Sequence, residues 1–346
     1  MSRFLKTLLL VAGIMISGTI LCLSPVGRYL EENLGLSILY KLRGTRTPPS
    51  DVAIIAIDQE SARRLELSSK FDQWPRSVHA EFLKHLAGAG AKVLAIDIIF
   101  KEKRDESQDR ALAESIKTAG NVVLVELMQK EKIPVSSGSK QSTEQIEIRK
   151  LVRPIDRLKD ASAASAPFPL PKVPVKVSRY WTFITAAGDT PSLPIVTFQI
   201  FARAAYGQLV ELLRQTGRHI DGLPLNDQRL LATGRVERVV RTIRDKFEAD
   251  PALVHALMEK ISASAGAFEK QQLLLLDRLI RMYAAPDSHF LNYYGPPATI
   301  PTTSYHQLIS RQGNLWEVSD LSEYKGKAVF IGLSERQTPL KKDGFY

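Results

Sequence analysis

The sequence predicts an α/β protein: a mostly parallel sheet with βαβ crossovers, a helical insertion, and one N-terminal transmembrane helix. Three observations support this: continuous apolar runs alternate with amphipathic helices, residues 207–283 have helical spacing throughout, and residues 7–27 carry no charge. The chain has 346 residues, of which 44% are apolar and 24% charged, so it can bury a sizeable core. That length corresponds to roughly two domains, or to one large domain with an insertion.

The N-terminus predicts a membrane anchor. Arg3 and Lys6 precede the uncharged residues 7–27, a stretch that covers the ~30 Å hydrocarbon layer at ~1.5 Å per helical residue. A cleaved signal peptide and a buried soluble helix are the alternatives, but Pro25 directly follows the best cleavage site, at Ser24. We therefore expect a cytoplasmic segment 1–6, a single inner-membrane span over 7–27 and an extracytoplasmic domain over 28–346.

The segment after the anchor, Arg28–Tyr40, predicts an amphipathic helix. Strand and helix patterns then alternate. The expected strands are Val52–Ile57, Val93–Ile96 and Val122–Val125, and the expected helices between them are Val78–Ala87 and Asp109–Ala119. Continuous apolar strands of this kind are typical of parallel strands covered on both faces, so we expect βαβ crossovers.

The second half of the chain contains the helical insertion. The polar stretch Gln129–Gln145 predicts a loop, and Gly207–Tyr283 predicts three or four helices inserted into the α/β body. The sheet is then expected to resume with strands Phe290–Tyr294 and Lys327–Gly332. Because the last of these strands lies so near Tyr346, we expect the sequence to be truncated.

Two aspartates are the first candidates for a functional site. Asp58 and Asp97 follow two strands that we expect to be neighbours, at the carboxyl edge where ligands bind in open α/β sheets. Converging carboxylates there would hold Mg²⁺ or hydrogen-bond a polar ligand. The alternative is that each aspartate caps a loop and accepts backbone N–H bonds.

Arg76 is the third candidate, in the segment Trp74-Pro75-Arg76-Ser77 before the first crossover helix. It either pairs with a ligand anion or bridges a carboxylate beneath a packed Trp74. We take Asp58, Arg76 and Asp97 as candidate ligand-binding residues, and we expect no catalytic residue, no bound metal and no cofactor. Dinucleotide-binding, P-loop, zinc-protease and serine-hydrolase motifs are missing from the sequence.

Composition narrows the choice of partners. Lys+Arg 47 against Asp+Glu 37 gives a net charge of +10, but the basic residues are scattered rather than clustered in one tract. This pattern favours a basic surface that partly faces anionic lipid over a nucleic-acid site. Cys22 is the single cysteine, so no intrachain disulfide can form.

Several segments match a family in order along the chain. They are the apolar strand ending at Asp58, Trp74-Pro75-Arg76, His79, Gly88–Ala91, Ala95–Phe100, Gly120–Leu124, Pro191–Pro194, Phe290–Pro297 with Pro301-Thr302, and Gly326–Gly332. Together they resemble the second type of CHASE domain, the cyclase/histidine-kinase-associated sensory extracellular domain. In that family a transmembrane helix leads into an extracytoplasmic sensory domain, and further spans and a cytoplasmic cyclase or kinase usually follow.

The resemblance implies a membrane-anchored signal-input domain of a bacterial receptor. Its partners would be the membrane, a small-molecule or ionic signal and a second copy in a homodimer, with no nucleic acid. The family contributes no catalytic residues. This chain departs from the family in its longer helical stretch, Gly207–Tyr283, and in ending before any returning helix. The alternative function is a metal-dependent extracytoplasmic hydrolase that uses Asp58 and Asp97.

Overall fold

The protein is built on one mostly parallel seven-stranded sheet, which confirms the α/β class. The computed structural model describes residues 3–134, 145–170, 172–173, 176–218, 220–263, 269–313 and 315–334. The strand order is β12–β1–β15–β2–β3–β4, and β5 also pairs with β3. Only the β3–β4 pairing in this sheet is antiparallel. The strands are β1 (Val52–Ile57), β2 (Val93–Asp97), β3 (Val122–Pro134), β4 (Gln145–Val152), β5 (Ala164–Pro167), β12 (Thr302–Ser304) and β15 (Ala328–Leu333).

Each face of the sheet has its own apolar core, because successive side chains of a strand point to opposite faces. In β2, Leu94 and Ile96 pack with helices α5 (Arg76–Gly88) and α6 (Glu106–Ala119). Val93 belongs to the other core, which α8 (Leu193–Phe201) covers. Because both faces of the sheet are covered, every buried position of β2 is apolar. This explains why its sequence is an uninterrupted apolar run.

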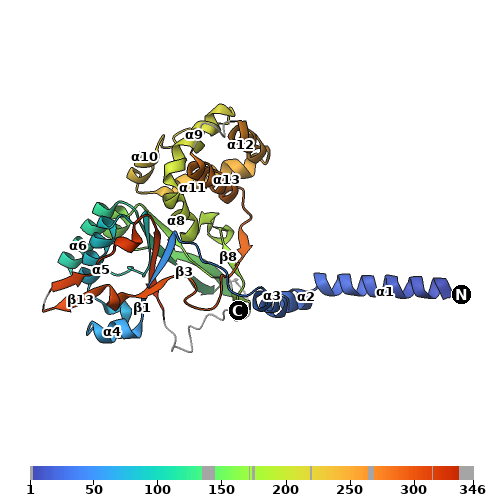
Figure 1. The fold of residues 1–346 in the computed structure, drawn as a ribbon, viewed down its shortest axis with the longest axis horizontal. Coiled ribbons are helices and arrows are strands. Elements are labelled where there is room, and N and C mark those ends of the chain that lie inside the picture. Colours follow the sequence, from blue (N-terminus) through green and yellow to red (C-terminus); the bar gives the residue numbers. More distant parts are fainter. Residues whose placement is uncertain are drawn as a thin grey trace, which may run out of the picture.

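The helices between residues 206 and 283 form a lobe that stands on α8, away from the sheet (Figure 1). They are α9 (Tyr206–Gln215), α10 (Asp227–Ala232), α11 (Val236–Ala249), α12 (Ala252–Ala263) and α13 (Lys270–Tyr283). The described part of this region thus has five helices, rather than three or four. Their buried residues belong to the same core as those of α8, so the lobe is joined to the body by continuous packing.

The remaining elements are short. They are α4 (Gln59–Arg64), η2 (Phe71–Gln73), α7 (Asp156–Ala161), η3 (Thr185–Ala187), η4 (Arg203–Ala205), η6 (Tyr305–Gln307) and η7 (Ser322–Tyr324), with strands β6 (Lys172–Val173), β7 (Lys176–Val177), β8 (Arg179–Trp181), β9 (Phe183–Ile184), β10 (Thr190–Pro191), β11 (Ser288–Phe290), β13 (Ile309–Gln312) and β14 (Leu315–Val318).

Two further sequence predictions are wrong in detail. The stretch from Phe290 does not rejoin the main sheet: β11 ends at Phe290 and pairs with β8 in a separate two-stranded sheet. The predicted loop Gln129–Gln145 is in part strand, because β3 runs to Pro134 and pairs with β4. Residues 135–144 of that prediction lie outside the described residues. Cross-strand pairing outweighs local polarity in this hairpin.

The N-terminal helix α1 (Arg3–Leu23) projects from the domain as a single helix with no buried residue (Figure 1). It is followed by α2 (Pro25–Leu30), the π-helical turn η1 (Glu31–Gly35) and α3 (Leu36–Arg43), which confirms the helix expected over Arg28–Tyr40. Helix α3 lies against the segment after β11: the Tyr40 hydroxyl donates to the Leu291 carbonyl. These contacts join the start of the domain to a segment about 250 residues further along the chain.

Candidate functional site

Asp58 lies at the carboxyl end of β1, where it caps helix α4. Its carboxylate accepts hydrogen bonds from the Ser61 backbone N at 2.8 Å and the Ser61 hydroxyl at 2.7 Å. The usual role of an N-cap aspartate is to accept hydrogen bonds from the free N–H groups at the start of a helix. Of the two alternatives open from the sequence, Asp58 therefore has the geometry of a helix cap.

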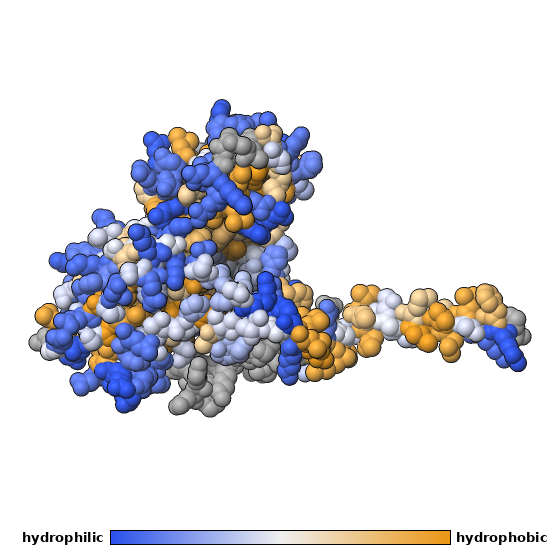
Figure 2. Space-filling view, in the orientation of Figure 1, coloured by the Kyte–Doolittle hydropathy of each residue, from blue (hydrophilic) through white to orange (hydrophobic). Residues whose placement is uncertain are grey.

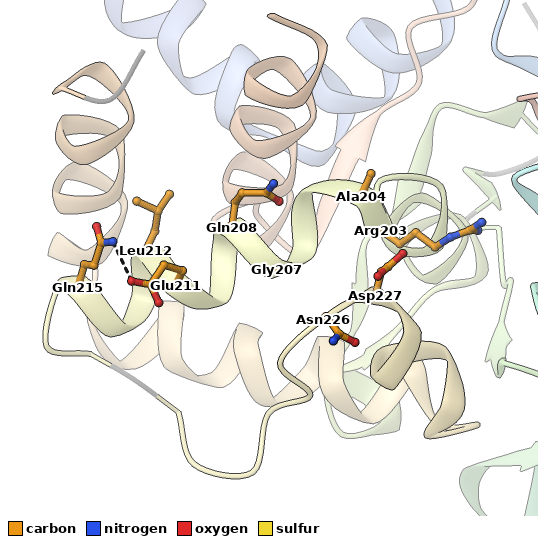
Figure 3. Close-up of a pocket in the computed structure, with 9 residues that line it drawn as sticks. All are labelled: Arg203, Ala204, Gly207, Gln208, Glu211, Leu212, Gln215, Asn226 and Asp227. Carbon is orange, nitrogen blue, oxygen red and sulfur yellow. Dashed lines mark hydrogen bonds between the residues drawn. The ribbon is translucent and has the colours of Figure 1, made fainter. Parts of the chain in front are cut away.

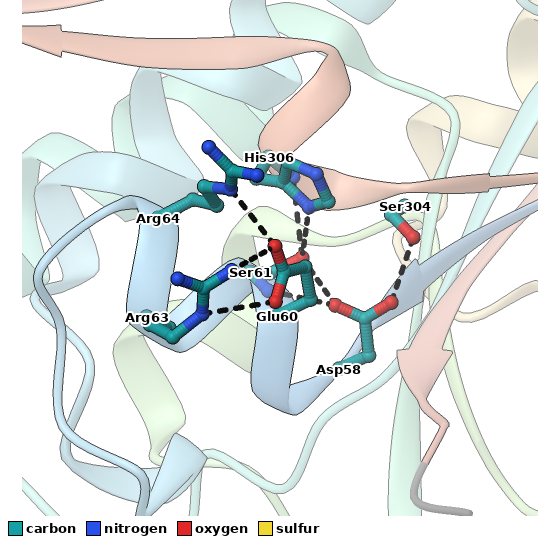
Figure 4. Close-up of polar contacts among 7 residues, drawn as sticks. All are labelled: Asp58, Glu60, Ser61, Arg63, Arg64, Ser304 and His306. Atoms are coloured by element: carbon teal, nitrogen blue, oxygen red, sulfur yellow. Dashed lines mark hydrogen bonds and ion pairs between the residues drawn. The ribbon is translucent and has the colours of Figure 1, made fainter.

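Two residues from the far end of the chain complete the surroundings of Asp58 (Figure 4). The Ser304 hydroxyl donates to Asp58 Oδ2 at 2.7 Å, and His306 Nδ1 lies 3.3 Å from the Ser61 hydroxyl. Burial opposes ionisation of Asp58, but the hydrogen bonds from Ser304 and Ser61 and the nearby His306 outweigh it, so its pKa is lowered. Asp58 is therefore a stable carboxylate at neutral pH.

The serine, histidine and aspartate in this cluster do not form a hydrolytic triad. In a triad the histidine takes the proton of the serine, and the aspartate orients the histidine. Here Asp58 accepts the hydroxyl hydrogen of Ser61 itself, and Ser61 is completely buried. The arrangement fixes a loop and keeps the Ser61 hydroxyl away from solvent.

The prediction that Asp58 and Asp97 follow neighbouring strands is wrong. Asp97 is the last residue of β2, but β15 lies between β1 and β2 and pairs with both. Two strand spacings of about 4.8 Å place the backbones of the two strand ends about 10 Å apart, so the two carboxylates could meet only above the intervening strand β15. Both aspartates are still at the carboxyl edge, as expected.

Asp97 lies beside the glycine of the intervening strand. Gly332 is its register partner in β15, and a Cβ atom on Gly332 would lie 3.2 Å from Asp97 Cβ. The Asp97 side chain is exposed, although the crowded sheet edge raises the pKa of its carboxyl through desolvation. Asp97 keeps contact with solvent, so an incoming ligand can reach its carboxylate.

Arg76, the third candidate, is only 2% exposed. Its guanidinium forms an ion pair with Asp109 and donates to the Glu102 carbonyl, so it joins helix α5 to the loop and helix that follow β2. Burial lowers the pKa of Arg76, and the charge of Asp109 opposes that shift. Its Nε atom is buried without a hydrogen-bond partner in the described residues.

A small cavity of about 50 Å³ lies beside Arg76 and is lined in part by Trp74, His79 and Phe100. The His79 ring stacks on Trp74, with 6.0 Å between ring centroids. Burial lowers the pKa of His79 to about 4, and Arg104 and Arg76 add to the shift. His79 is therefore neutral at physiological pH. The cavity has room for a few water molecules or one small ion.

Two larger hollows were not anticipated from the sequence. One, of about 530 Å³, is lined by Arg64, Leu65, Glu66, His306, Ile309, Ser310, Arg311 and Gly313. With two arginines and a histidine it suits a small anionic ligand, and its His306 contacts the Ser61 that Asp58 holds. Arg64 also forms an ion pair with Glu60, in which Arg64 Nε lies 2.8 Å from Glu60 Oε1 (Figure 4). The residues that line this hollow are far apart in the sequence, so no local motif marks it.

The other hollow, about 350 Å³, lies in the helical lobe (Figure 3). Arg203 and Asp227 lie at one end of it and Glu211 with Gln215 at the other. Gln215 donates to Glu211 at 2.8 Å. Most of its charged groups already have partners, since Arg203 donates to the Lys92 carbonyl and Glu211 accepts from Arg214.

The described residues contain no group of three or more histidine, cysteine, aspartate or glutamate side chains placed to hold a metal ion. The two aspartates of the hydrolase alternative are also set apart by β15, and Asp58 already accepts three hydrogen bonds.

Comparison with known proteins gives one clear result. The CHASE2 domain family matches residues 7–345, nearly the whole chain, whereas no curated protein and no solved structure matches it. Helix α1 (Arg3–Leu23) is the one helix in the described residues that is long and apolar enough to cross a membrane, a test that an anchor and a signal sequence both pass. With its α/β fold and this N-terminal helix, the chain belongs to the CHASE2 family of extracellular sensory domains, which provide the signal input of a signalling protein.

Proposed function

We propose that the chain is the membrane-anchored extracytoplasmic input domain of a bacterial receptor whose output is a cyclase or a kinase. The membership of the CHASE2 family carries this proposal. Residues 7–27 would span the inner membrane once, with residues 1–6 in the cytoplasm and residues 28–346 outside. Arg3 and Lys6 support this orientation, since positive charge favours the cytoplasmic side.

The contacts of α3 offer a route by which the domain could act on the anchor. Tyr40 and Arg43 bind the segment that follows β11: Arg43 donates to the Asn292 side chain and to the Tyr293 carbonyl. Upstream of that segment, Arg244 donates to the carbonyls of Tyr283 and Ala285 at 2.6 and 2.7 Å. A ligand that favours one of two arrangements of the lobe would shift the position of α3 through these contacts.

The signal would be a small molecule or an ion that binds at the carboxyl edge of the sheet, with Asp97 contacting it and Asp58 and Arg76 holding the loops on either side. Asp97 suits a cationic or hydrogen-bond-donating group, whereas the hollow with Arg311 and His306 suits an anion. The receptor would work as a homodimer, without a cofactor or a nucleic-acid partner.

A single-cysteine experiment tests the topology, because Cys22 is the only native cysteine. In a Cys22→Ser background, Arg3→Cys and Lys84→Cys place the thiol at the N-terminus and on the exposed side of α5. We expect a membrane-impermeant maleimide to label Lys84→Cys in intact cells and Arg3→Cys only after lysis. The reverse pattern, or loss of the Arg3→Cys thiol from the mature protein, contradicts an uncleaved N-in anchor.

Ligand binding is tested by thermal unfolding of the detergent-solubilised full chain with a panel of small anions, amines and divalent cations. A ligand should raise the midpoint temperature. Asp97→Ala should abolish the shift if an amine or a cation binds, and Arg311→Ala should abolish it if an anion binds. Lys84→Ala is the control that should keep it. No shift with any compound, or shifts that neither variant affects, contradicts binding at this edge.

The hydrolase alternative makes a different prediction for Asp58. If Asp58 carries a catalytic metal, Asp58→Asn abolishes phosphatase and esterase turnover. If Asp58 is a cap, Asn replaces it with little loss of stability, because Asn is as good an N-cap as Asp, while Ala costs about 1 kcal/mol. We expect no turnover by the wild-type chain with or without Mg²⁺. Turnover that Asp58→Asn abolishes would revive the hydrolase.

A further inference from the structure

The helix that follows the membrane span has an apolar face that the domain does not cover. Five large apolar residues of α2, η1 and α3 recur every four positions: Val26, Leu30, Leu34, Ile38 and Leu42. Their exposed fractions are 60, 40, 56, 55 and 80%. We call this set the apolar stripe. Large apolar side chains contiguous along one helix indicate an interaction surface.

The π-helical turn keeps the stripe on one face. In a regular α-helix, positions four apart advance by about 400°, so a row with this spacing drifts by about 40° at each step. The turn Glu31–Gly35 lies in the middle of the stripe. A π-turn takes more residues per turn, which cancels part of the drift. Leu30 and Leu34 therefore stay closer to the face of Ile38 and Leu42 than they would in a regular α-helix.

The domain lies on the other side of the helix. Tyr40 and Arg43 make the contacts to the segment 291–294, and Tyr40 is also packed edge-on against Tyr293 with 5.5 Å between ring centroids. Ile38 and Leu42 lie two positions before and after Tyr40, which places them about 160° around the helix from it. The stripe thus faces directly away from the domain.

The chain turns sharply between α1 and α2, near the outer end of the span proposed over residues 7–27. The backbone around Gly27 comes so close to Leu21 that a Cβ atom on Gly27 would lie 1.9 Å from the Leu21 carbonyl oxygen. In one continuous helix, residues six apart would be separated by about 9 Å along the axis. Helix α2 therefore leaves the axis of α1 at this corner, instead of continuing away from the bilayer.

We propose that Pro25–Arg43 is an interfacial helix that lies on the outer surface of the membrane, with the apolar stripe in the lipid. This proposal rests on the membrane anchor of the proposed function. The stripe continues the apolar surface of α1 directly, and Figure 2 shows apolar side chains running from α1 onto this segment. The described part of the domain lies beyond the C-terminal end of α1 and does not extend alongside this helix, so a bilayer can surround α1 (Figure 1).

Charge supports lipid as the occupant. Residues 25–43 include Arg28, Lys41 and Arg43 against Glu31 and Glu32, an excess of one positive charge, and Arg46 follows shortly after the helix. Amphipathic helices with basic residues beside an apolar face bind anionic membrane surfaces in this way. A helix held between lipid and the 291–294 segment would couple the height and tilt of the domain to the membrane.

The test uses the full chain, Cys22→Ser, reconstituted in vesicles of phosphatidylethanolamine and phosphatidylglycerol. A nitroxide is attached at Ile38→Cys in the stripe, at Lys41→Cys beside it, or at Ile14→Cys in α1. Collision with oxygen, which concentrates in lipid, is compared with collision with a water-soluble nickel complex. We expect the oxygen-to-nickel ratio at Ile38→Cys to exceed that at Lys41→Cys several-fold and to approach that at Ile14→Cys.

Two results would overturn the proposal. A ratio at Ile38→Cys as low as at Lys41→Cys would place the stripe in water. Spin–spin broadening at Ile38→Cys that disappears on dilution with unlabelled chain would show that a second copy covers the stripe. The Ile14→Cys label separates these results from failure of the anchor, because without a membrane span all three labels would be in water.

Discussion

Arg76 and Asp109 form the most deeply buried ion pair in the described part of the chain, with side chains 2 and 4% exposed. Removal of one partner leaves the other charge buried and unpaired, and this typically costs about 3–5 kcal/mol. We expect Asp109→Ala to lower the free energy of unfolding by about that amount in urea denaturation followed by tryptophan fluorescence.

The matched control for this pair is Arg63→Ala. Arg63 pairs with Glu60 on the surface, where 66 and 41% of the two side chains are exposed, and such exposed pairs contribute little to stability. Equal losses in the two variants would contradict a structural role for the Arg76–Asp109 pair.

His79 predicts a loss of stability in mild acid. Its pKa is about 4 in the folded protein, against about 6.5 when unfolded, so the unfolded chain takes up the proton first as the pH falls. Above about pH 6.5 His79 is neutral in both states and does not lower the free energy of unfolding. Between about pH 6.5 and 4 its protonation in the unfolded chain lowers the free energy of unfolding, by about 3 kcal/mol in total.

The effect of His79 is measured as a difference between the wild type and His79→Gln, because other groups titrate in the same range. Burial raises the pKa of Glu237 to about 6, so its contribution increases as the pH falls from about 6 to 4.5 and opposes that of His79. His79→Gln should remove the acid-dependent loss between pH 6.5 and 4. The same slope in both proteins would assign the loss to other residues.

At the scale of elements, the corner at Gly27 determines where the membrane-proximal helix lies. Gly27→Ala would bring a methyl group against the Leu21 carbonyl, so the corner has to open. Double electron–electron resonance between labels at Ile14→Cys and Ile38→Cys should then show a longer distance, toward the ~36 Å of a straight helix of 24 residues.

Gly13→Ala in the middle of α1 is the control for this change, since a Cβ there meets no atom within 4 Å apart from its chain neighbours and the nearby backbone of its own helix. It should leave the distance distribution as it is. An unchanged distribution in Gly27→Ala as well would mean that the corner does not depend on this glycine.

At the scale of the whole molecule, the strand nearest the end of the sequence lies in the middle of the sheet. β15 pairs with β1 on one side and β2 on the other, and Val329 is fully buried. A proline there removes a ladder hydrogen bond and strains both neighbours, at about 3 kcal/mol or more. We expect Val329→Pro to abolish cooperative thermal unfolding, as measured by circular dichroism.

The edge strand supplies the comparison. In β12 the register places Thr302 opposite Ile54, and the bond from Ile54 goes to the Pro301 carbonyl, so the Thr302 N–H points away from β1. Thr302→Pro should therefore retain the cooperative transition. If both prolines are tolerated, β15 is not a central strand in solution.

Local patterns located most elements of this fold. The strand predicted over Val52–Ile57 is β1 residue for residue, and the last strand differs from its prediction by one residue at each end. The order of strands could not be predicted in this way. An apolar run shows that both faces of a strand are covered, but it does not show which strand is its neighbour.

In the candidate site, too, local features could be predicted from the sequence but contacts between distant residues could not. The capping role of Asp58 was one of two alternatives open from the sequence, because an aspartate before a helix is a local feature. Its partners Ser304 and His306 come from about 245 residues away, and no spacing rule connects them. Arg76 and Asp109 are likewise joined only by the packing of α5 against α6.

By itself, the sequence determined the fold class, the apolar N-terminal helix and the membership of a sensory family, because these depend on composition, periodicity and ordered motifs within short windows. Tertiary structure alone decided that β15 separates Asp58 from Asp97, that Arg76 is buried against Asp109, and that the apolar stripe faces away from the domain. Each of these depends on which distant surfaces meet, and that is set by the free energy of packing the whole chain.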